Sequence, residues 1–97
     1  MDEALVSCDQ AEELARAIGY PIAIAQITDT RAMIELKQGK FEAAAARAED
    51  AARLYLEFGT APDALGMLEV AAEAWRRAGE DSRAQECDSR ARELTLA

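Results

Sequence analysis

The residues of this chain that could do chemistry are two cysteines and three pairs of adjacent carboxylates. The cysteines are Cys8 and Cys87, and the pairs are Glu12-Glu13, Glu49-Asp50 and Glu80-Asp81. A reactive thiolate needs a basic neighbour that lowers its pKa, and none stands at helical spacing on the apolar face of either cysteine. Adjacent helix positions point to different sides of a helix, so such carboxylates do not share a site. We therefore expect free, buried thiols and carboxylates on the solvated surface.

Other catalytic and cofactor signatures are missing from the sequence. The chain has no His, and it lacks the paired Cys spacing of a zinc site, a glycine-rich phosphate loop and a nucleophile elbow. We expect no enzyme activity, no catalytic residue, no metal site and no cofactor.

The charge of the chain narrows the class of partner. Its 97 residues carry 19 acidic and 11 basic side chains, a formal net charge of −8. Nucleic acids and anionic membranes need a basic surface, so we expect neither as a partner. The start Met1-Asp2-Glu3-Ala4 lacks the basic residues and apolar core of a secretory signal, which makes the cytoplasm the expected location.

Regularly spaced glycines divide the chain into helical segments. The interval from Gly19 to Gly59 equals that from Gly39 to Gly79 (59 − 19 = 79 − 39 = 40), which predicts two alternating kinds of turn. We call this interval the repeat period. Between the glycines Ala, Leu, Glu, Arg and Gln, all good helix formers, recur at helical spacing. The pattern predicts five helices, over about residues 2–18, 21–38, 41–58, 61–78 and 82–96.

Local signals support the helix starts. Asp2 is a candidate N-cap, and Pro21 suits the first turn of the second helix. Thr60 followed by Asp63, and Ser82 followed by Gln85, have the spacing of capping residues. Trp75 falls on an apolar stripe, which predicts a place in the core.

The helices match one another when the chain is shifted by one repeat period. The matching sets are Leu14, Leu54 and Leu94; Ala11, Ala51 and Ala91; Ala32 and Ala72; and Ala44 and Ala84. Small residues at matching positions let neighbouring helices approach closely. We predict an all-α fold in which residues 1–97 form a single domain, a right-handed α-solenoid of about five antiparallel helices.

The positions of the small residues resemble the tetratricopeptide repeat family, specifically the longer-loop repeats of bacterial signalling and regulatory proteins. The matching residues are Ala32, Ala44 and Ala51, then Ala72, Ala84 and Ala91, with Gly39-Lys40-Phe41 as a turn followed by an aromatic. The resemblance covers the chain as a half repeat at 2–18 and full repeats at 21–58 and 61–96. A period of this length also fits HEAT-like solenoids, but the alanine pattern favours tetratricopeptide repeats.

The sequence departs from the family pattern at three positions. Arg31 and Glu35 stand where inner helices are usually apolar, and Asp81 replaces the aromatic that matches Phe41. These departures call the packing of the second helix into question.

The resemblance implies a non-catalytic protein-protein interaction module. In this family the first helix of each repeat lines a concave groove that receives a peptide or a partner helix. The groove residues would be Gln26, Asp29, Met33, Leu36, Lys37, Glu69, Val70, Glu73 and Arg77. Members that clamp an acidic peptide carry basic residues or Asn at positions that hold Asp29 and Glu69 here. We therefore expect a basic or mixed-charge protein or peptide as partner, although the same charges could serve only solubility.

A second hypothesis is self-assembly. The first helix resembles the second helix of a repeat, so Leu5, Val6 and Leu14 would lack part of their cover. Exposed apolar strips mark interfaces. We therefore expect either that the chain is a fragment of a longer repeat array, as part of a larger bacterial regulator, or that it forms a homodimer through this strip.

Overall fold

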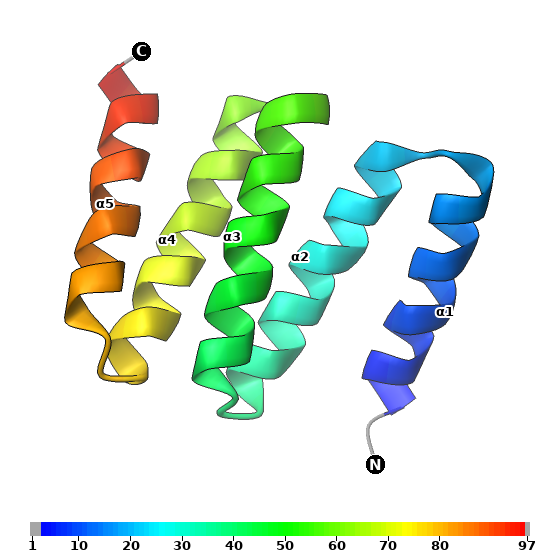
Figure 1. The fold of residues 1–97 in the computed structure, drawn as a ribbon, viewed down its shortest axis with the longest axis horizontal. Coiled ribbons are helices and arrows are strands. Elements are labelled where there is room, and N and C mark those ends of the chain that lie inside the picture. The colour runs from blue at the N-terminus through cyan, green and yellow to red at the C-terminus, as the bar shows by residue number, and fades with distance from the viewer. Residues whose placement is uncertain (1–2, 97) are drawn as a thin grey trace.

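The computed structural model describes residues 3–96, which form five α-helices (Figure 1). They are α1 (Glu3–Ile18), α2 (Pro21–Lys37), α3 (Phe41–Phe58), α4 (Ala61–Arg77) and α5 (Asp81–Leu96). The prediction of an all-α fold is confirmed, and the helix bounds lie within one residue of those expected from the sequence. The predicted N-cap Asp2 lies outside the described residues.

Glycine ends three of the helices in the same way. Gly19, Gly39 and Gly79 have positive φ angles of 67°, 78° and 82°. The amide after each glycine donates to a carbonyl five residues back, as from Lys40 to Glu35 at 2.9 Å. This is the Schellman pattern, in which a left-handed residue satisfies the last carbonyls of a helix. Gly59 alone differs, with φ −126°, so the expected alternation of two turn types is wrong.

The two capping signals have different outcomes. Thr60 caps α4, since its side-chain oxygen accepts from the Asp63 amide at 3.4 Å, and Pro21 lies in the first turn of α2. The capping box of Ser82 and Gln85 is wrong because α5 already begins at Asp81. The Gly79 turn sets this start, and the Glu80 carbonyl accepts the first helical bond from the Ala84 amide at 3.1 Å.

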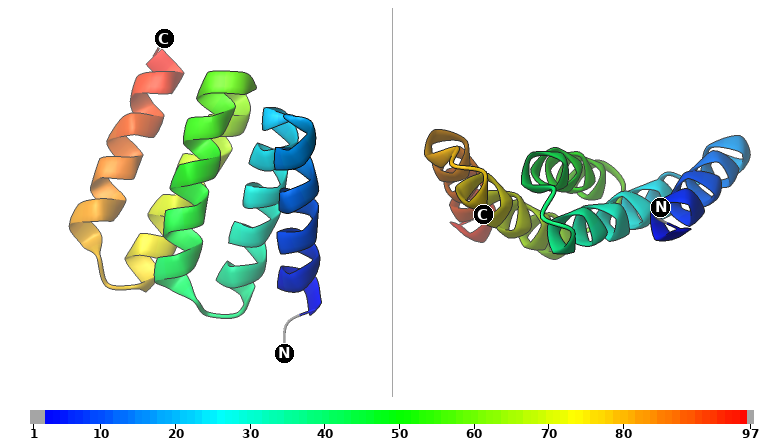
Figure 2. Two further views of the ribbon diagram at one scale, coloured as in Figure 1. Left: turned by 45° about the vertical axis from the view of Figure 1, so that its right-hand side comes forward. Right: turned by 90° about the horizontal axis from the view of Figure 1, so that it is seen from below.

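The helices pack mainly against their neighbours in the chain, in a body that measures 34 × 32 × 14 Å. Seen from below, α2 and α4 lie on one side and α3 on the other (Figure 2). The interface between α1 and α2 is the least extensive of the four between successive helices. Over the described residues, no helix is long and apolar enough to cross a membrane.

Alanine forms most of the core. Fully buried alanines come from the three central helices: Ala25 and Ala32 in α2, Ala44, Ala45, Ala48, Ala51 and Ala52 in α3, and Ala64, Ala71 and Ala74 in α4. Side chains this small let backbones approach closely, which is how a thin body excludes water. Four large residues complete this core, namely Tyr55, Met67, Leu68 and Trp75, so the predicted burial of Trp75 is confirmed.

Candidate protein-binding surfaces

Both cysteines are free and buried, as predicted. Burial, together with the negative charge of Glu49, raises the pKa of the Cys87 thiol to about 11. A thiol with a raised pKa holds little thiolate near neutral pH, so Cys87 is a poor nucleophile. Among residues 3–96, no three Cys, Asp or Glu side chains gather closely enough to hold a metal ion.

Glu49 is a half-buried structural residue that the sequence analysis missed. Its carboxylate accepts hydrogen bonds from Trp75 Nε1 at 2.7 Å and from an Arg90 guanidinium nitrogen at 3.0 Å. The carboxylate thereby joins α3 to both α4 and α5. The prediction that each carboxylate pair is solvated surface is therefore wrong for Glu49, while its neighbour Asp50 is exposed. Glu12 is half-buried as well and pairs with Arg16 of its own helix at 3.3 Å.

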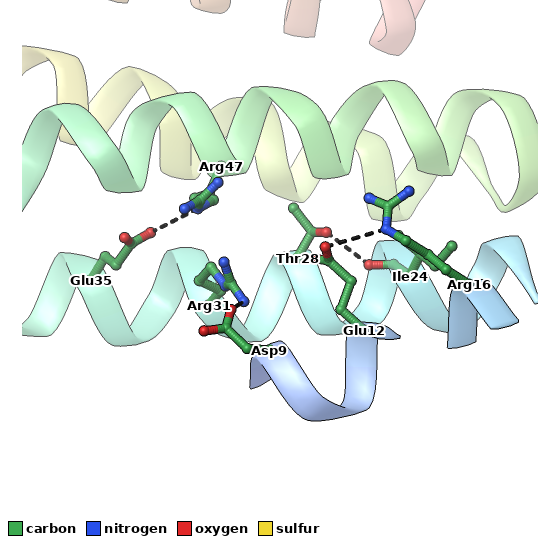
Figure 3. Close-up of polar contacts among 8 residues, drawn as sticks. All are labelled: Asp9, Glu12, Arg16, Ile24, Thr28, Arg31, Glu35 and Arg47. Atoms are coloured by element: carbon green, nitrogen blue, oxygen red, sulfur yellow. Dashed lines mark hydrogen bonds and ion pairs between the residues drawn. The ribbon is translucent and has the colours of Figure 1, made fainter. Parts of the chain in front are cut away.

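Two charged residues of α2 that are at least half-buried connect this helix to α1 and to α3 (Figure 3). Glu35, only 6% exposed, pairs with Arg47 of α3 at 3.4 Å, and the half-buried Arg31 pairs with Asp9 of α1. Thr28 satisfies its hydroxyl by donating to the Ile24 carbonyl at 2.8 Å. The two charged departures from the family pattern are thus accommodated by ion pairs, each to a neighbouring helix.

The predicted groove residues lie on α2 and α4 and divide into two groups. Leu36 and Val70 are half-buried and pack against the core. Asp29 and Glu73 are also half-buried, and the remaining residues are exposed: Gln26, Met33, Lys37, Glu69 and Arg77. We call these five exposed residues the α2–α4 face.

Two of the three predicted groove carboxylates already have partners within the chain. Asp29 accepts a hydrogen bond from the Tyr55 hydroxyl at 2.9 Å, and Glu73 pairs with Arg77 at 2.7 Å. The Arg77 guanidinium also lies over the Phe41 ring, 5.8 Å from its centre. The third carboxylate, Glu69, is exposed to solvent and has no partner in the described part of the chain.

A solvent-open hollow of about 460 Å³ lies between α1 and α2. Its lining is mostly apolar and consists of Ser7, Cys8, Ala11, Ala23, Gln26, Ile27, Thr30 and Ile34. The sequence analysis did not single out this hollow, and of the predicted groove residues only Gln26 lines it. A signal was present in the heptad-like spacing of Ser7, Ala11, Leu14 and Ile18 on α1 and of Ala23, Ile27, Thr30 and Ile34 on α2.

The residues predicted for a dimer surface do not form one patch. Val6 and Leu14 are 43% and 64% exposed, but Leu5 is half-buried. Nine positions separate Leu5 from Leu14 (14 − 5 = 9), and at about 100° per residue this places them on opposite sides of α1. Ile18, 64% exposed, shares the Leu14 side instead.

Searches among protein-family models, curated proteins and solved structures each find no match for this chain. The resemblance to tetratricopeptide repeats therefore rests on the residue pattern of the sequence alone.

Proposed function

We propose that this chain is a non-catalytic protein-protein interaction module that binds a protein or peptide on the α2–α4 face. In the tetratricopeptide-like solenoid that the sequence resembles, this face is the concave groove. The observation that carries the proposal is that α2 and α4, the helices that hold the predicted groove residues, lie on the same side of the molecule (Figure 2). Five of those residues are exposed. These side chains leave a surface on which a partner could lie across both helices.

The composition of the α2–α4 face favours a mixed-charge partner that also carries apolar groups. Met33 is 37% exposed and offers an apolar contact. Glu69 offers an unneutralised carboxylate, whereas Lys37 and Arg77 place positive charge in the last turns of their helices. Charges at a rim guide association and orientation more than they add affinity, so we expect modest affinity and fast exchange.

Selection of displayed peptides on the immobilised chain tests this proposal. Enriched peptides should carry Lys or Arg beside an apolar residue. Met33→Glu and Glu69→Lys should each weaken their binding by about tenfold, which corresponds to about 1.4 kcal/mol. Glu57→Lys makes the same charge change at an exposed position of α3 and serves as the matched control. Peptides that bind the Met33 and Glu69 variants as tightly as the wild type would contradict the proposal.

A second candidate function, self-assembly through α1, is favoured by the exposure of Leu14 and Ile18. Two such residues on one side of a helix are typical of a surface that is covered in an assembly. Light scattering should then show a dimer that Leu14→Glu dissociates without loss of helicity. A monomer at concentrations of about 100 μM, far above a micromolar dissociation constant, would rule this function out.

A further inference from the structure

The hollow between α1 and α2 is open to solvent and has a mostly apolar lining, which suits the apolar side of a helix. We call its eight lining residues the open seat. Leu14 and Ile18 extend its apolar surface, because they lie one and two turns beyond Ala11 on the same side of α1. Over the described residues, this surface is open to solvent, and the one extensive interface of α1 is with α2.

The internal repeat contains a second surface, formed by α3 and α4, that is equivalent to the open seat and is covered by a helix. A shift of one repeat period maps Cys8, Ala11, Ile27 and Ile34 onto Ala48, Ala51, Met67 and Ala74 of α3 and α4. All four of these are buried, with exposures of 0% to 6%. The helix packed against α3 on this side is α2, and it is joined to α3 by Glu35–Arg47 at 3.4 Å and by Tyr55–Asp29 at 2.9 Å. A helix therefore occupies the equivalent position one repeat later.

We propose that the open seat binds an amphipathic α-helix of a partner protein, antiparallel to α1 as α2 is to α3. The helix presents small residues seven positions apart, as α2 presents the fully buried Ala25 and Ala32. This inference rests on the proposed role as a protein-binding module, and it names a second surface and the kind of partner that fits there.

The differences between the two seats define the chemistry of the partner helix. Ser7 stands where α3 has Arg47, and Ala15 stands where α3 has Tyr55. The open seat therefore lacks both groups that hold the carboxylates of α2. A buried carboxylate without a partner is strongly unfavourable, so the partner helix has apolar or small residues where α2 has Asp29 and Glu35.

A second copy of this chain does not supply such a helix. The small-residue stripes of α2 and α4 are already buried within the chain, and so is the stripe of α5, formed by Ala84, Cys87 and Ala91. On the exposed side of α1, Ser7 and Ala11 are small, but the large residues Leu14 and Ile18 occupy the second half of that side. Within residues 3–96, the stripes of small residues seven positions apart on α2, α3, α4 and α5 are all covered.

A synthetic peptide and the reactivity of Cys8 test the inference. The peptide has the sequence of residues 21–40 with the substitutions Asp29→Ala and Glu35→Ala, which remove the two carboxylates. Cys8 is 7% exposed and lines the open seat, whereas Cys87 is 2% exposed in the core on α5 and serves as an internal reference. With the peptide at about ten times its Kd, roughly one seat in eleven is free, so alkylation of Cys8 should slow about tenfold. Alkylation of Cys87 should not change.

Two controls separate this inference from the proposed function. A peptide that also carries Ala25→Glu and Ala32→Glu should not protect Cys8. In the chain, Thr30→Glu, an exposed change on the open seat, should abolish protection, whereas Met33→Glu on the α2–α4 face should retain it. If protection is lost with Met33→Glu but not with Thr30→Glu, the peptide binds on the α2–α4 face and not in the open seat, which would overturn the inference.

Unchanged Cys8 alkylation at about 1 mM peptide, where even weak complexes form, would also overturn the inference. So would protection that rises with chain concentration in the absence of peptide, because it would identify a second copy as the occupant.

Discussion

The Tyr55 hydroxyl of α3 donates a 2.9 Å hydrogen bond to the Asp29 carboxylate of α2. Tyr55 is 5% exposed and Asp29 is half-buried, so the bond lies at the edge of the alanine core. It joins the two helices near the α2–α4 face, and it explains why a carboxylate predicted to contact a partner is engaged within the chain.

Tyr55→Phe should lower the free energy of unfolding by about 1.5 kcal/mol, because a hydrogen bond to a charged group is lost while the ring is kept. Urea unfolding followed by circular dichroism measures the effect. Tyr20→Phe is the matched control, since Tyr20 is 53% exposed. Equal stabilities of the two variants would show that the hydrogen bond contributes nothing.

Cys87 should make the stability fall in alkaline solution. Burial raises the pKa of its thiol from 9.0 to about 11. Between these values the folded chain keeps the proton that the unfolded chain releases, so unfolding becomes more favourable as the pH rises. The stabilising contribution is complete below about pH 9 and should be lost at up to about 1.4 kcal/mol per pH unit above it.

Urea unfolding of the wild type and of Cys87→Ala at pH 8, 9 and 10 measures this pH dependence. The decline between the last two values should be smaller in the variant. Parallel curves for the two proteins would contradict the assignment to Cys87. The comparison stops at about pH 10 because burial and the Asp29 contact also raise the pKa of Tyr55.

Glu49→Gln should destabilise the fold by about 1–2 kcal/mol, because the side chain loses the charge that strengthens its bonds to Trp75 and Arg90. Trp75 fluorescence should change with it, since the indole nitrogen donates to this carboxylate at 2.7 Å. The control is Asp50→Asn, the exposed neighbour, whose ion pair to Arg53 is 3.9 Å long. If Asp50→Asn lowers the stability as much as Glu49→Gln does, the bonds of Glu49 to Trp75 and Arg90 do not account for the loss.

Gly66→Ala and Gly39→Ala should have opposite effects on stability. A Cβ at either position meets nothing within 4 Å, so crowding does not separate them. Gly66 lies inside α4, where Ala should stabilise by about 0.8 kcal/mol. Gly39 has a φ of 78°, where a Cβ is strained, so Ala there should destabilise by about 1 kcal/mol. Thermal melts measure both, and shifts of the same sign would contradict this account of the turns.

The helices and the alanine core could be predicted because they depend on local spacing and on an internal repeat. The bonds of Glu49 could not, since its partners stand 26 and 41 residues away and an adjacent carboxylate pair is typical of solvated surface. The start of α5 was misplaced because Ser82 carries a capping motif, whereas the Gly79 turn sets where the helix begins. The spacing of small and apolar residues indicates which sides of α1 and α2 line the hollow. It does not encode how widely the two helices separate, and the volume of the hollow depends on that separation.

A titration of the isotope-labelled chain with one selected peptide, followed by amide chemical shifts, tests the binding role most directly. The account predicts the largest shift changes at Gln26, Met33, Lys37, Glu69 and Arg77, the residues of the α2–α4 face. Shift changes that gather instead around Glu42 and Glu57, exposed residues of α3, would contradict it.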